Sequence, residues 1–98
     1  MSEPRVVERL LVYRTLPQRN VLALKVELAD DGKVSFVPGD ERSEEALRML
    51  QDGVESRGVH VTPDQGSVFL RAVYDMLQRA SVWHAVRDTS VAAQEETH

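Results

Sequence analysis

The sequence predicts an α+β domain, in which a small antiparallel sheet of three or four strands carries two helices packed on one face. Three observations predict this fold class. Residues 21–29 alternate with the period of a strand, a turn containing Gly32 follows them, and the apolar side chains of residues 63–80 repeat with the period of a helix. Ninety-eight residues suffice for one such domain, which we expect to occupy residues 1–87.

The first third of the chain is expected to form the sheet. We interpret Val6–Arg14 as a strand, because its β-branched start and Tyr13 favour a strand, although its apolar side chains could also form a helical stripe. Val21–Ala29 is the clearer strand. Residues 34–37 return antiparallel after the turn at residues 30–33, so the simplest assembly of the three strands is a meander.

The alternation within the second strand assigns its side chains to two faces. Leu22, Leu24, Val26 and Leu28 share one face of a regular strand, and Val21 and Ala23 share the other. With the helices on the first face, Val21 and Ala23 would lie on the uncovered face together with either Leu11 and Tyr13 or Leu10 and Val12. Such a surface is moderately apolar and costly to expose to water.

A first, short helix is expected after Pro38. Asp40 or Ser43 would cap it, and Gly53 would end it in the left-handed conformation that glycine favours. Residues 55–57 would then be linker. The buried stripe of this helix is expected to contain Ala46, Leu47 and Leu50.

The second helix has the strongest start signal in the chain. Thr62 and Gln65 have the spacing of a capping box, and Pro63 suits the first helical position. The apolar side chains that follow cover a wide arc of the helix. Val68 falls outside this arc, so we expect an exposed valine or a contact residue.

After Ala80 the helical pattern fails, and we expect Ser81–Arg87 to be extended and to add a fourth, edge strand. Trp83 and His84 would then point to opposite faces, with Trp83 closing the core or anchoring an interface. Residues 88–98 have no periodicity and are expected to be a disordered tail.

Composition excludes several classes of function. The chain contains no cysteine and has a net charge of −4 without a cluster of Lys and Arg, so we expect no thiolate metal site and no nucleic-acid partner. The first residues do not resemble a signal peptide, and no long apolar run is present. We therefore expect a cytoplasmic protein without membrane contact, metal or cofactor.

The residues that could carry chemistry are few. His60 lies four residues before Asp64, but the expected helix start separates them, and a lone histidine is rarely a metal site. No serine has the setting of a nucleophile, so we name no catalytic residue. Tyr13, His60, Trp83 and His84 are the residues that could line a small-molecule pocket.

Two functions are favoured over nucleic-acid binding through the N-terminal arginines. The first is a non-catalytic interaction or regulatory module, with a protein partner or a second copy of the chain bound through the uncovered sheet face. Its candidate interface residues are Trp83, Val21, Ala23 and Val68. The alternative is a small-molecule-binding domain or minor enzyme whose pocket contains Tyr13, His60, Trp83 and His84.

Overall fold

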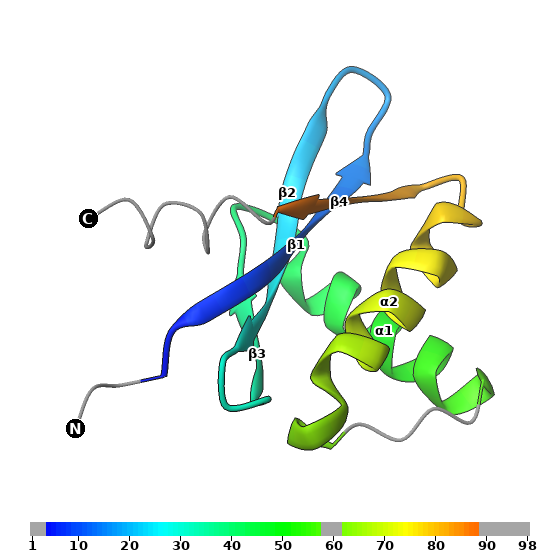
Figure 1. Ribbon diagram of the computed structural model, residues 1–98. Coiled ribbons are helices and arrows are strands. Elements are labelled where there is room, and N and C mark those ends of the chain that lie inside the picture. Colours follow the sequence, from blue (N-terminus) through cyan, green and yellow to red (C-terminus); the bar gives the residue numbers. More distant parts are fainter. Residues whose placement is uncertain (1–3, 58–61, 89–98) are drawn as a thin grey trace.

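The computed structural model describes residues 4–57 and 62–88 of the chain. Its strands are β1 (Val6–Thr15), β2 (Asn20–Ala29), β3 (Val34–Pro38) and β4 (Trp83–Asp88), and its helices are α1 (Ser43–Arg57) and α2 (Gly66–Gln78), the second preceded by a 3₁₀ turn, η1 (Pro63–Gln65). Figure 1 shows both helices on the same side of the sheet. The prediction of an α+β domain with two helices on one face is confirmed.

The sheet is antiparallel throughout, with the strand order β3-β2-β1-β4. The β2–β3 hairpin turns at Gly32, whose φ of 89° is a conformation that glycine adopts without steric cost. The expected meander and the expected edge strand at the end of the chain are therefore confirmed. Strand β4 includes Asp88, which the sequence had assigned to the tail, and the rest of that tail, residues 89–98, lies outside the described residues.

The hydrophobic core lies between the sheet and the two helices. The sheet contributes Leu10, Val12, Leu24, Val26, Leu28 and Ala85, and the helices contribute Ala46, Leu50, Phe69, Leu70, Val73 and Leu77, all of which are buried. The helical periods of α1 and α2 predicted all six of the helical positions. Val68 is 66% exposed on α2, as its place outside the apolar arc indicated.

A β-bulge in β2 changes which of its side chains face the helices. Val12 of β1 pairs with Leu24, but the next residue, Tyr13, pairs with Leu22. Ala23 is the extra residue between these pairs, so it has no cross-strand partner of its own. Past the bulge, the alternation of side chains along β2 is shifted by one residue.

The expectation that Val21 and Ala23 lie on the uncovered face is wrong for this reason. Both are buried on the helix side, with 4% and 0% of their surface exposed. Leu22 consequently lies on the uncovered face, whereas a regular strand would have buried it. Local periodicity could not reveal the shift, because the bulge exists only in the pairing of β2 with β1.

Helix α1 begins and ends differently from the expectation. Arg42 occupies the N-cap position, because the N–H of Ala46 donates to its carbonyl at 3.0 Å, so neither Asp40 nor Ser43 is the N-cap residue. Arg42 also has a φ of 67°, which is uncommon for a residue with a side chain. At the other end, the helix continues through Gly53 to Arg57, so residues 55–57 are helical and not linker.

Gly53 serves helix packing and does not terminate α1. A Cβ atom at this position would lie 2.1 Å from the Sδ atom of Met76 on α2, so the absence of a side chain allows this close approach. A glycine inside a helix costs about 1 kcal/mol relative to alanine. The expectation that Gly53 ends the first helix is therefore wrong, and this glycine lies where α1 packs against α2.

The capping box predicted for the second helix does not form. Thr62 is the N-cap residue of η1, but its side chain makes no capping hydrogen bond. The N–H of Gln65 instead donates to the backbone carbonyl of Thr62 at 3.0 Å, which closes the 3₁₀ turn and occupies the donor that the box requires. The α-helix proper starts at Gly66.

Candidate functional site

The uncovered sheet face carries an apolar patch. Strand pairing aligns Val37, Lys25, Leu11 and Val86 in one row across the four strands, and Leu22, Tyr13 and His84 in the next. We define the apolar patch as Leu11, Tyr13, Leu22, Val37 and Val86. None of its five members is fully buried, and Val86 is 40% exposed.

An ion-pair row borders this patch. Arg9 lies between Glu27 on one neighbouring strand and Asp88 on the other. Its Nε atom is 2.8 Å from a carboxylate oxygen of Glu27, and a terminal nitrogen is 3.9 Å from one of Asp88. The row gives the uncovered face a polar boundary on one side.

Of the residues that were candidates for one small-molecule pocket, the structure brings two together and places a third on the other side of the sheet. Tyr13 and His84 are cross-strand partners on the uncovered face, and His84 is exposed. Trp83 points to the opposite side, where it is 6% exposed and closes the core next to β1. These three side chains therefore do not converge, and His60 lies outside the described residues.

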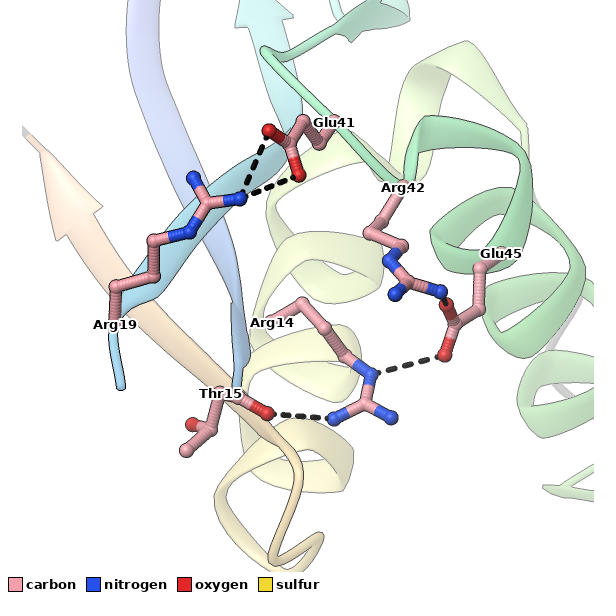
Figure 2. A network of polar contacts seen from close by, with 6 residues as sticks. All are labelled: Arg14, Thr15, Arg19, Glu41, Arg42 and Glu45. Atoms are coloured by element: carbon pink, nitrogen blue, oxygen red, sulfur yellow. Dashed lines mark hydrogen bonds and ion pairs between the residues drawn. The ribbon is translucent and has the colours of Figure 1, made fainter. Parts of the chain in front are cut away.

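Arg14 links the sheet to the start of α1 (Figure 2). Its guanidinium carbon lies 5.6 Å from the ring centroid of Trp83, and its Nε atom donates to a carboxylate oxygen of Glu45 at 2.9 Å. The hydrogen bond from Arg14 is the main reason that the pKa of Glu45 lies below its ordinary value. Arg42, which also points at Glu45, lowers that pKa further.

A second pair in Figure 2 joins Arg19 to Glu41, with both carboxylate oxygens 3.1 Å from one guanidinium nitrogen. Glu41 and Glu45 both lie near the start of α1. Arginine side chains neutralise both of them. Within the described residues, no group of three or more acidic or histidine side chains could hold a metal ion.

An apolar cleft that the sequence did not predict lies between β3 and the helices. It encloses about 310 Å³ and is lined by Phe36, Leu47, Leu50, Gln51, Val54, Glu55 and Phe69. The rings of Phe36 and Phe69 meet edge to face, with centroids 6.1 Å apart. Leu47 was expected to be buried but is 40% exposed at this cleft, because no element of the described chain packs over it.

Comparisons of the chain with models of protein families, with curated proteins and with solved structures gave no match. Among the described residues, no helix is both long and apolar enough to cross a membrane. Inferences about function therefore depend on the two apolar surfaces described above.

Proposed function

We propose that this protein is a non-catalytic interaction module that forms a homodimer through the apolar patch on its uncovered sheet face. The observation that supports this proposal is the patch itself. Five apolar side chains lie in two neighbouring rows of the pairing register, with Lys25 between Leu11 and Val37, and both helices lie on the other side of the sheet. A second copy of the same patch would remove these side chains from water.

The charges on this face favour a second copy as the partner. Arg9 and Lys25 are balanced by Glu27 and Asp88, although the whole chain has a net charge of −4. Two copies can therefore approach face to face with little like-charge repulsion. Lys25 lies within the patch, but its alkyl stem can contribute apolar surface while its ammonium group reaches the edge.

The size of the face limits the affinity. Four strands about 4.8 Å apart and about six residues long present roughly 400 Å² of sheet. This is about half of the roughly 800 Å² that each partner buries in a standard interface. We therefore expect a weak dimer, with a dissociation constant on the order of 10 μM, or about −7 kcal/mol.

Sedimentation equilibrium at tens of micromolar tests the proposal, with two variants that introduce the same charge at different places. Leu22→Glu puts a carboxylate into the patch and should give the mass of one chain. Val68→Glu is the matched control, because Val68 is an exposed valine on α2, away from the sheet face, and should leave the dimer intact. A wild-type mass of one chain would overturn the proposal, as would equal masses for the two variants.

A further inference from the structure

The apolar cleft is located at an edge of the sheet. Phe36 belongs to β3, which is the outermost strand, and the facing wall is formed by Leu47 and Val54 of α1. Phe36 and Leu47 are 41% and 40% exposed, although both are large apolar side chains. A concave surface that leaves such side chains in water is a candidate binding site.

The backbone of β3 offers hydrogen bonds at the same edge. The N–H of Ala29 in β2 donates to the carbonyl of Lys33 at 2.9 Å, so odd-numbered residues of β3 direct their backbone groups toward β2. Those of Val34 and Phe36 therefore point away from the sheet, where the described chain supplies no further strand. Pro38 has no N–H, so the edge can accept only a short partner strand.

These two features together define the shape of a ligand. An extended chain alongside β3 would pair with Val34 and Phe36, and alternate side chains of the added strand would face the helices. Those side chains would enter the cleft next to Phe36. In an extended ligand, apolar residues at positions i and i+2 point to the same side and lie about 7 Å apart, so two of them can face the cleft together.

The rim of the cleft indicates the charge of the ligand. Glu55 lies at the rim and is exposed. In the part of the chain that the structure describes, its carboxylate forms no ion pair and accepts only a 3.5 Å hydrogen bond from Gln51. A Lys or Arg beside the apolar residues of the ligand would complement this carboxylate.

We propose that β3 and the apolar cleft bind an extended peptide segment of another protein, which adds a fifth strand to the sheet. Two alternating apolar side chains occupy the cleft, and a flanking basic residue faces Glu55. This site is distinct from the uncovered face, because Phe36 is on the helix side of the sheet, where it contacts Phe69. The proposal goes beyond the homodimer and does not depend on it.

Fluorescence anisotropy with the full chain and the labelled peptide KTLTVTK tests this site. We expect a dissociation constant on the order of 100 μM. In an antiparallel pair, the leucine and valine that face the cleft also direct their N–H groups at the backbone of β3. The same peptide with both of these nitrogens methylated, and the acidic peptide ETLTVTE, should each bind about tenfold more weakly. Equal binding of all three peptides would overturn the proposal.

Variants of the protein locate the site. Leu47→Glu should weaken binding of KTLTVTK about tenfold, and Glu55→Lys should make ETLTVTE the better ligand. Leu22→Glu is the control, because it alters only the uncovered face and should bind KTLTVTK as the wild type does. Loss of binding in Leu22→Glu would assign the peptide to the other surface and overturn the proposal.

A second copy of the chain is the competing occupant of this edge. If β3 paired with β3 of another molecule, Leu47→Glu would lower the mass measured by sedimentation equilibrium. That result would overturn the assignment to a foreign peptide. An unchanged mass together with weakened peptide binding would support it.

Discussion

The β-bulge in β2 can be tested by placing the same charge at two consecutive residues. Ala23 has no exposed surface and faces the helices, whereas Leu22 is partly exposed on the other side of the sheet. A regular strand, without the bulge, would exchange these positions. The variants Ala23→Glu and Leu22→Glu should therefore differ strongly in stability, and the order of their stabilities reports the bulge.

The magnitudes follow from burial. A carboxyl with an ordinary pKa near 4.3 must be protonated to enter the core, which at pH 7 costs about 3.7 kcal/mol. The added atoms at Ala23 cost about 1–3 kcal/mol more by overpacking. The total of about 5–7 kcal/mol is comparable to the entire stability of a small domain. Leu22 is only partly buried, so Leu22→Glu should lower the free energy of unfolding by only about 1 kcal/mol.

Chemical denaturation at about 1 μM protein, well below the dissociation constant expected for the dimer, measures the monomer alone. The pH dependence provides a second readout for Ala23→Glu. Burial raises the pKa of the introduced carboxyl in the folded state. The loss in the free energy of unfolding, relative to the wild type, is therefore largest at neutral pH and shrinks as the pH falls toward about 4.3. The reasoning would be refuted if Leu22→Glu were the more damaging substitution.

Two further predictions concern the helix starts. Thr62→Ala should change the free energy of unfolding by less than about 0.5 kcal/mol, because the Thr62 side chain makes no capping hydrogen bond. A loss of about 1 kcal/mol, measured by urea denaturation, would show that the capping box forms. Glu45→Gln should lower the denaturation midpoint at neutral pH. Since the hydrogen bond from Arg14 lowers the pKa of Glu45, this difference should disappear as the pH falls through that lowered pKa. The matched control Glu44→Gln, one residue earlier and outside the Arg14 network, should not show this dependence; a parallel response of both variants would contradict the assignment.

The sequence alone determined the elements whose signals are local. The alternation of β2, the turn at Gly32 and the apolar arc of α2 each arise from neighbouring residues, and all three were predicted. The opposite directions of Trp83 and His84 followed from the alternation of a strand in the same way. These features together were enough for the fold class and for the expectation of an uncovered sheet face.

The tertiary structure decided which residues form the candidate surfaces. The bulge at Ala23 depends on how β2 pairs with β1, and Gly53 lies inside α1, where it faces the side chain of Met76 on α2. The cleft at Phe36 exists because α1 and α2 leave the edge strand partly uncovered. Each of these features is a contact between segments distant in the sequence, so no local periodicity encodes it. A shift of one residue in pairing exchanges the two faces of a strand, which is why the uncovered face was expected but two of its residues, Val21 and Ala23, were misplaced.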